Sequence, residues 1–269
     1  MIWEEIINKS NVTGRKVQQV FQEETHKAIL ACLSRENAFN DLVFQGGTSL
    51  RLFYGNPRFS EDLDFVLQEG KKRFDLTKKI SKIQTFVNEL FPFLEKIKIE
   101  IQKNDKNMQR IIFKIISDIP DQKLRIHLEL AYVPSYQNQP RILDYPPLNP
   151  AVRVEAMSEI LADKLTALAN RSYLKGRDIW DIYFLVVEKQ ITVPWNLVIK
   201  KANDYGFTSA GLKKDLLDAC RQLRKEGVLI LSNEMIRFLP MSLFDQYSDM
   251  FDKIVNRVAE EAEKVKDSD

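Results

Sequence analysis

The chain has 269 residues, 44% of them hydrophobic, so it can hold one large or two small domains with a real core. Its 40 Lys and Arg against 38 Asp and Glu give a formal net charge of +2, which excludes nucleic-acid binding driven by overall charge alone. No run approaches the ~20 apolar residues of a membrane span, and the N-terminal stretch carries acids where a signal peptide needs an apolar run. We therefore expect a cytoplasmic protein with no membrane partner. Cys32 and Cys220 lack partner ligands nearby, which favours buried thiols over a disulfide framework or a zinc site.

The first half of the chain mixes helical and extended patterns. Apolar residues recur at helical spacing over residues 15–37 and again over 71–90, and a short buried strand is predicted over 42–44. Three more strands are predicted in succession, over 95–101, 110–116 and 124–132. A mixed sheet of about five strands flanked by helices fits this order, which is an α+β fold.

The second half of the chain is predicted to be helical after an irregular connection. Residues 134–150 contain five prolines, which suit neither a helix nor a central strand, so we expect a long ordered loop or linker there. Beyond it the apolar pattern is helical almost throughout. We therefore predict a sheet core with an N-terminal helix over residues 1–150 and a helical domain over 151–269.

The most informative segment is GGTSLRLFYGNPRFSEDLDF, residues 46–65. The double glycine follows the short strand, and Thr48 or Ser49 can cap a helix that runs through Tyr54. Backbone amides at such a glycine turn and helix start can hold phosphate oxygens. The segment thus predicts a phosphate site at Gly46 and Gly47.

The same segment ends in two carboxylates one residue apart. Side chains alternate along an extended backbone, so Asp62 and Asp64 share one face, which suits one or two divalent metal ions. Arg58 and Ser60 have the same even spacing and are expected on that face of the same strand. A lone Gly-Gly is most often a turn and a lone D-x-D a solvated strand face, but their combination is more specific.

A second polar group interrupts the apolar helices over residues 160–185. Lys164 stands among apolar residues, where a partly buried ammonium needs an anion such as a phosphate or a carboxylate. Asp178 and Asp181 follow Arg177 and are neighbours on one helix face. These acids either take part in a site or simply favour the helix N-terminus and pair with arginines.

Taken together, the two segments resemble the AbiEii/AbiGii-type nucleotidyltransferases, which include toxins of toxin–antitoxin systems. The resemblance covers about residues 15–190 and implies a nucleotidyltransferase core, joined to a helical region that contributes to the active site, acting on a metal-bound nucleoside triphosphate. It also implies a role for each matching residue. Gly46, Gly47 and Thr48 or Ser49 would sit against the phosphates, Asp62 and Asp64 would bind Mg²⁺, Arg58 and Ser60 would support the triphosphate, and Lys164 and Asp178 would complete the site.

A third carboxylate is expected from a later strand. Glu129 on the alternating strand is the best candidate, as a metal ligand or as the base toward the attacking hydroxyl. His127 is on the same face and is either an alternative base or a surface residue.

The expected reaction is Mg²⁺-dependent transfer of a nucleotide from an NTP to an acceptor hydroxyl. The resemblance favours an RNA 3′ end, with tRNA as the acceptor, and a cognate antitoxin as the protein partner. Residues 71–127 hold 14 Lys and Arg against 7 Asp and Glu, which offers RNA phosphates a place to dock unless this is only a solvated surface. Two alternatives stay open: a small-molecule, antibiotic-type nucleotidyltransferase, and a non-catalytic partner-binding module of the same fold.

Overall fold

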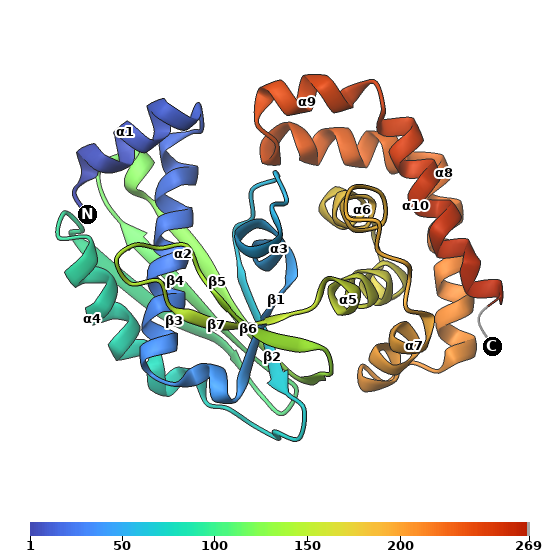
Figure 1. Ribbon diagram of the computed structural model, residues 1–269, viewed down its shortest axis with the longest axis horizontal. Coiled ribbons are helices and arrows are strands. Elements are labelled where there is room, and N and C mark those ends of the chain that lie inside the picture. The colour runs from blue at the N-terminus through green and yellow to red at the C-terminus, as the bar shows by residue number, and fades with distance from the viewer. Residues whose placement is uncertain (268–269) are drawn as a thin grey trace. The chain divides into compact units, whose positions relative to one another are not determined.

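The computed structural model describes residues 1–267, and the chain divides into two units (Figure 1). The first unit contains Met1–Phe53 and Phe59–Glu155. The second begins with the short segment Tyr54–Arg58 and resumes at Ala156.

The first unit is a seven-stranded mixed sheet with helices, as the α+β prediction required. The strands are β1 (Leu42–Gln45), β2 (Leu63–Gln68), β3 (Lys96–Asn104), β4 (Met108–Ile116), β5 (Leu124–Ser135), β6 (Asn138–Ile142) and β7 (Ala151–Glu155). Their order in the sheet is β3-β4-β5-β2-β1-β7-β6. The neighbours β2 and β5, and β1 and β7, run parallel, and the other pairs are antiparallel.

Four helices belong mainly to this unit: α1 (Trp3–Thr13), α2 (Val17–Arg35), α3 (Gly46–Tyr54) and α4 (Ile80–Leu90). Helix α2 contacts α1, α4, β5 and β7, and it lies across the sheet in Figure 1. Alternation along β5 gives the sheet two different faces. Ile126, Leu128 and Leu130 are buried, whereas the intervening Arg125, His127 and Glu129 are exposed or half-buried.

The structure corrects three details of the sequence prediction. The sheet has seven strands instead of about five, and one of the added strands, β7 (Ala151–Glu155), lies at the start of the stretch predicted to be helical. The proline-rich stretch is not one long loop, because residues 138–142 form β6, an edge strand that accommodates Pro140. In addition, β2 begins only at Leu63, so Arg58, Ser60 and Asp62 precede the strand and do not share one continuous strand face with Asp64.

The second unit is helical. Its helices are α5 (Met157–Asn170), α6 (Gly176–Tyr183), α7 (Trp195–Asp204), α8 (Ser209–Phe238), α9 (Met241–Ser248) and α10 (Phe251–Glu263). Helix α8 contacts each of the other five. Gly176 lets α6 begin directly against α8, since a Cβ there would lie 2.8 Å from the carbonyl oxygen of Ile230. Among residues 1–267, no helix is long and apolar enough to cross a bilayer.

Candidate active site

The glycine turn after β1 is shaped by the carboxylate of Asp64. Gly46 has φ +78°, in the left-handed region, and a Cβ on it would lie 2.7 Å from Asp64 Oδ2. The strand register explains this closeness, because Gln45 and Asp64 are direct partners in the β1–β2 pair. Glycine is therefore required at position 46 so that the turn can close onto the carboxylate.

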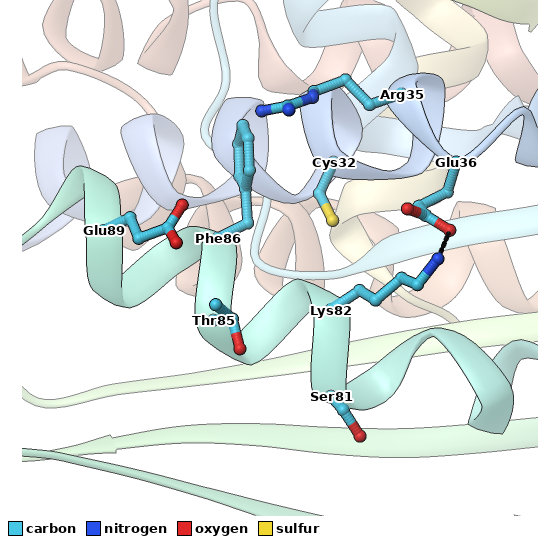
Figure 2. A pocket seen from close by; sticks show the side chains of 8 residues that line it. All are labelled: Cys32, Arg35, Glu36, Ser81, Lys82, Thr85, Phe86 and Glu89. Atoms are coloured by element: carbon cyan, nitrogen blue, oxygen red, sulfur yellow. Dashed lines mark hydrogen bonds and ion pairs between the residues drawn. The ribbon is translucent and has the colours of Figure 1, made fainter.

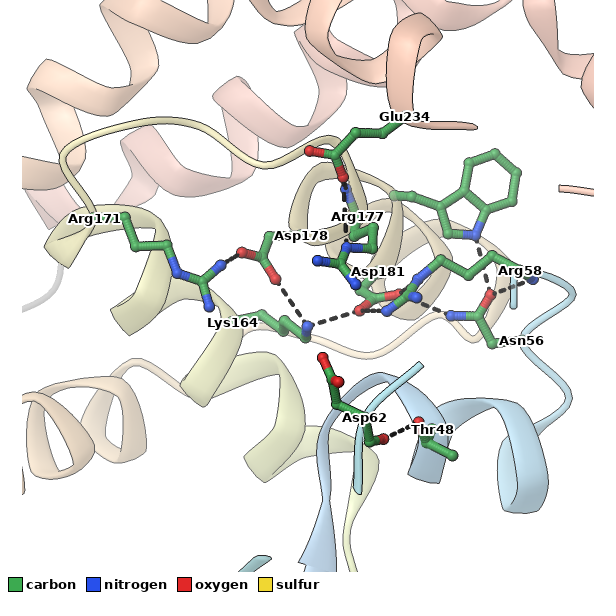
Figure 3. A network of polar contacts seen from close by, with 11 residues as sticks. Thr48, Asn56, Arg58, Asp62, Lys164, Arg171, Arg177, Asp178, Asp181 and Glu234 are labelled. Carbon is green, nitrogen blue, oxygen red and sulfur yellow. Dashed lines mark hydrogen bonds and ion pairs between the residues drawn. The ribbon is translucent and has the colours of Figure 1, made fainter. Parts of the chain in front are cut away.

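The three residues that follow Gly46 are buried. The Thr48 hydroxyl donates a hydrogen bond to the carbonyl oxygen of Asp62 and so ties the start of α3 to the segment that enters β2 (Figure 3). Ser49 is fully buried, and its hydroxyl has no hydrogen-bond partner among residues 1–267. Gly47 is buried beside them. The two hydroxyls therefore face the interior.

Two carboxylates and a histidine lie together where β2 begins beside β5. His127 Nδ1 is 2.8 Å from Asp62 Oδ1, a distance at which the imidazole N–H donates to the carboxylate. Both side chains remain about 30% exposed. Asp64 is half-buried and is the register partner of Glu129 on β5. The polar face of the sheet thus brings together the acids that the sequence placed there.

Glu129 is already engaged by a cation. Its Oε1 lies 2.7 Å from Arg110 Nε, and Arg110 Nη2 donates to Oε2 at 3.2 Å, across the β4–β5 pair. This two-point ion pair neutralises the carboxylate. Among the described residues, no group of three or more His, Cys, Asp and Glu side chains is arranged to hold a metal ion. The role of Glu129 as a third carboxylate stays a prediction.

Asp62 and Asp64 nevertheless fit a magnesium ion. They are partly exposed and supply the oxygen ligands that Mg²⁺ prefers. In nucleotide enzymes Mg²⁺ is commonly bound by one or two carboxylates, with waters and substrate phosphates completing its coordination. A third protein carboxylate is not required for that arrangement.

Arg58 lies in the second unit and contacts an acid, although it was expected to support the triphosphate. Its guanidinium forms two parallel bonds to Asp181, Nε to Oδ1 at 2.6 Å and Nη2 to Oδ2 at 2.6 Å (Figure 3). The Arg58 side chain is 2% exposed and that of Asp181 is fully buried. Asn56 also donates to Asp181 Oδ1, at 2.9 Å, and accepts the indole N–H of Trp180 at 3.0 Å.

Lys164 contacts two acids of α6. Its apolar surroundings in the sequence predicted that its ammonium needs an anion. Its ammonium lies 2.8 Å from Asp178 Oδ1 and 2.8 Å from Asp181 Oδ2 (Figure 3). Asp178 is also paired with Arg171. An ammonium has three N–H donors, so one remains available beyond these two carboxylates within residues 1–267. The predicted pairing of the α6 acids with arginines is thus present alongside the lysine.

Burial and charge act in opposite directions on this network. Burial alone would raise the pKa of Asp181, but the charges of Arg58 and Lys164 and their hydrogen bonds hold it at about 2. Burial lowers the pKa of the Lys164 ammonium, opposed by its attraction to Asp181. The cluster has three cations, Arg58, Lys164 and Arg171, and two anions, Asp178 and Asp181. It therefore keeps one positive charge that can attract a phosphate.

Sequence reasoning missed the role of Asn56, although it lies inside the GNPRF part of the first segment. Asn56 holds Asp181, Trp180 and the backbone N–H of Arg58 at once. An asparagine before a proline indicates a turn. Its partner Asp181 lies 125 residues away in the sequence, so no neighbouring residue indicates the contact. Ser60 is half-buried, and its predicted contact with the triphosphate stays a prediction.

A separate cavity of about 340 Å³ lies between α2 and α4 (Figure 2). Two of its charged residues form an ion pair, since Glu36 at the end of α2 binds Lys82, and the Arg35 guanidinium covers the Phe86 ring. Burial and the nearby Glu36 raise the pKa of Cys32 to about 11, so its thiol is not an activated nucleophile. We call the surface formed by Asp62, Asp64, His127 and Glu129 the carboxylate face. The residues that line the cavity do not share its chemistry.

Comparisons with known proteins bear on the family and the fold of the chain. The family model described as "Nucleotidyl transferase AbiEii toxin, Type IV TA system" matches residues 28–262. The chain is similar in structure to a putative nucleotidyltransferase from H. pylori, with 19% identity, TM-score 0.55, and 94% of this chain and 98% of that one covered. It is also similar to JHP933 from Helicobacter pylori, with 19% identity, TM-score 0.52, and 93% and 96% covered. At this identity the two structures show a shared fold. No curated protein matches the chain significantly.

Proposed function

The chain belongs to the AbiEii nucleotidyl transferase toxin family, and from this premise we propose that it transfers a nucleoside monophosphate from Mg²⁺-bound NTP to an RNA 3′ hydroxyl, with tRNA as the favoured acceptor. Its membership in a type IV toxin–antitoxin family implies an NTP substrate and an antitoxin partner. The metal, the RNA acceptor and the residue roles below are our proposal.

One observation carries the proposal: Asp62, just before β2, and Asp64, within it, lie beside a glycine turn that no larger residue could form. A Cβ on Gly46 would lie 2.7 Å from Asp64 Oδ2, so the backbone of the turn runs close to one carboxylate. A phosphate bound by the Gly46 and Gly47 amides would therefore lie close to a metal bound by Asp64. Because the hydroxyls of Thr48 and Ser49 face the interior, we assign the phosphate contact to backbone amides of this turn.

The protein's own residues bind, orient and neutralise charge in the proposed reaction. Asp62 and Asp64 would hold Mg²⁺, which when bound neutralises negative charge on the triphosphate oxygens. His127 donates to Asp62 and so fixes the direction of that carboxylate, the usual task of a residue just outside the ligand shell. The acceptor oxygen bonds to the α-phosphorus as the bond to pyrophosphate breaks, and Glu129 is the proposed acceptor of the hydroxyl proton.

Lys164 and Asp178 are the remaining proposed participants. The excess positive charge of their cluster and the third N–H donor of Lys164 suit a phosphate oxygen. Arg58 is reassigned from the triphosphate to a positioning role, because its guanidinium is buried and held by Asp181, which also contacts Lys164.

The decisive test is the Asp64→Asn variant incubated with labelled NTPs and total RNA. It should lose nucleotide transfer entirely while its urea unfolding midpoint stays near that of the wild type. Asp118→Asn removes a carboxylate from an exposed position outside the carboxylate face and should keep full activity. Full activity in the Asp64 variant would sink the proposal.

Three measurements on the wild-type protein separate the alternative functions. Deep sequencing of RNA 3′ ends reports the acceptor and the added base together. Label recovered in a small molecule, with none in RNA, supports an antibiotic-type enzyme. Failure to bind Mg·NTP in isothermal titration supports a non-catalytic partner-binding module.

A further inference from the structure

Three cations stand side by side across three strands of the first unit. Lys98 on β3 is the register partner of Lys114 on β4, and Lys114 is the register partner of Arg125 on β5. We call these three residues the cation row. Lys98 and Arg125 are exposed, and the Lys114 side chain is 30% exposed.

The cation row lowers the free energy of unfolding of the protein when no partner is bound. Like charges directly opposite each other on neighbouring strands repel, and this row has two such pairs in succession. Glu100 relieves part of the repulsion through a 2.7 Å ion pair with Lys114. Lysine on an edge strand such as β3 can protect that edge from aggregation, but β4 and β5 are interior strands of the sheet, where this explanation fails.

The row lies on the same face of the sheet as the proposed metal ligands. Arg125, His127 and Glu129 alternate along β5, and Glu129 is the register partner of Asp64. Four residues of an antiparallel strand span roughly 14 Å, which sets the distance from Arg125 to Glu129 along the strand. An RNA strand whose 3′ end lies at the carboxylates would therefore reach the cation row within a few nucleotides.

Other charges on this face have the same sign. Strand register places six cations on the β3–β5 part of the face, against the two carboxylates Glu100 and Glu129. The cations are Lys96, Lys98, Lys103, Arg110, Lys114 and Arg125. A polyanion that crosses β5, β4 and β3 would relieve their repulsion, whereas a single small anion would meet only part of the row.

We propose that the cation row binds the phosphate backbone of the RNA acceptor just upstream of the 3′ end that receives the nucleotide. This inference rests on the proposed function and adds where the acceptor lies. The contact is to phosphates, so it orients the RNA without reading its sequence. Binding should accordingly depend strongly on salt and little on base identity.

The test measures RNA binding without reaction. A fluorescent RNA hairpin with a single-stranded 3′ tail is titrated with Asp64→Asn protein in the absence of NTP, over a range of salt concentrations. The Lys98→Gln, Lys114→Gln, Arg125→Gln triple variant is compared with Lys214→Gln, Lys225→Gln, Lys253→Gln. The control variant removes the same charge from three exposed lysines of the helical unit.

Loss of three single-strand phosphate contacts should lower the slope of log affinity against log salt by about 2. At 0.1 M salt this corresponds to a dissociation constant that is weaker by about tenfold to a hundredfold. The control variant should change the slope by less than half a unit. The urea midpoint of the row variant should not fall, because its like-charge pairs are relieved.

Equal RNA affinity and equal salt slope in the two triple variants would overturn the proposal. The cation row would then be assigned to binding of an acidic protein partner. This failure is distinct from failure of the proposed function. Binding is measured without NTP, whereas nucleotide transfer to RNA is measured separately with the wild-type protein.

Discussion

The Asp181→Asn substitution tests how the α6 network is held together. It keeps the shape of the side chain but removes the charge that faces both Arg58 and Lys164, at 2.6 Å and 2.8 Å. Arg58 and Asp181 are almost completely buried, and removal of one partner from a buried ion pair costs about 3–5 kcal/mol. We expect the free energy of unfolding at pH 7 to fall by about that amount.

The same substitution should change the pH dependence of stability. The pKa of Asp181 is about 2 in the folded protein against an ordinary 3.8, so the unfolded chain binds more protons between these values. Stability from this group is therefore complete above about pH 4 and is lost as the pH falls toward 2. This lowering of the pKa corresponds to roughly 2–3 kcal/mol of stability. The variant should lack this part of the acid sensitivity.

The measurement is urea unfolding followed by circular dichroism at pH 7 and at several values down to pH 2.5. Asp245→Asn serves as the control, because Asp245 is an exposed acid on α9, away from the buried network. It should unfold within about 0.5 kcal/mol of the wild type at pH 7. A loss below 1 kcal/mol in the Asp181 variant, or the same acid dependence as the wild type, would refute the reasoning.

Two further predictions concern the turn and the entry to β2. Gly46→Ala should lower the free energy of unfolding by about 1–3 kcal/mol and nucleotide transfer at least tenfold, because a Cβ would lie 2.7 Å from Asp64 Oδ2. Gly14→Ala is the control, because Gly14 also has a positive φ but a Cβ on it would meet no atom within 4 Å. An equal loss in both variants would contradict this account. His26 on α2 lies with its ring Nε2 3.1 Å from the carbonyl oxygen of Glu61, just before β2. Burial lowers the pKa of His26 to about 4, so wild-type stability should fall by about 3 kcal/mol as the pH drops from 6.5 to 4. His26→Gln should remove that fall in urea unfolding, and an unchanged pH profile would show that another group is responsible.

Local patterns were sufficient to predict the carboxylate face. Alternation along an extended chain depends only on neighbouring residues, and it correctly placed His127 and Glu129 opposite the buried Ile126 and Leu128. The apolar surroundings of Lys164 likewise predicted that its ammonium needs an anion. That prediction is confirmed by Asp178 and Asp181, both of which contact it. In each case the physical requirement is visible within one element of secondary structure.

Pairings between distant segments could not be predicted in the same way. The ion pair between Arg110 and Glu129 depends on the β4–β5 register, and that register follows from the whole sheet. Strand β6 was missed because proline content argues against a strand in general and does not reveal that this one lies at the edge. The sequence indicated the positive excess over residues 71–127 but not the alignment of the cation row, since its three members come from three strands.

Arg58 shows why a contiguous motif need not be one structural site. Even spacing suggested that Arg58 and Asp64 share a strand face, but the residues between them are not part of β2, so the alternation argument ends at Leu63. Arg58 and Asn56 instead belong to the helical unit, where both contact Asp181. An arginine with two N–H groups on a buried carboxylate is fixed in place and cannot turn to a triphosphate without breaking that two-point ion pair. The motif therefore contains two separate functions: the glycine turn and the aspartates suit phosphate and metal, and the Asn-Pro-Arg run holds the acid that faces Lys164.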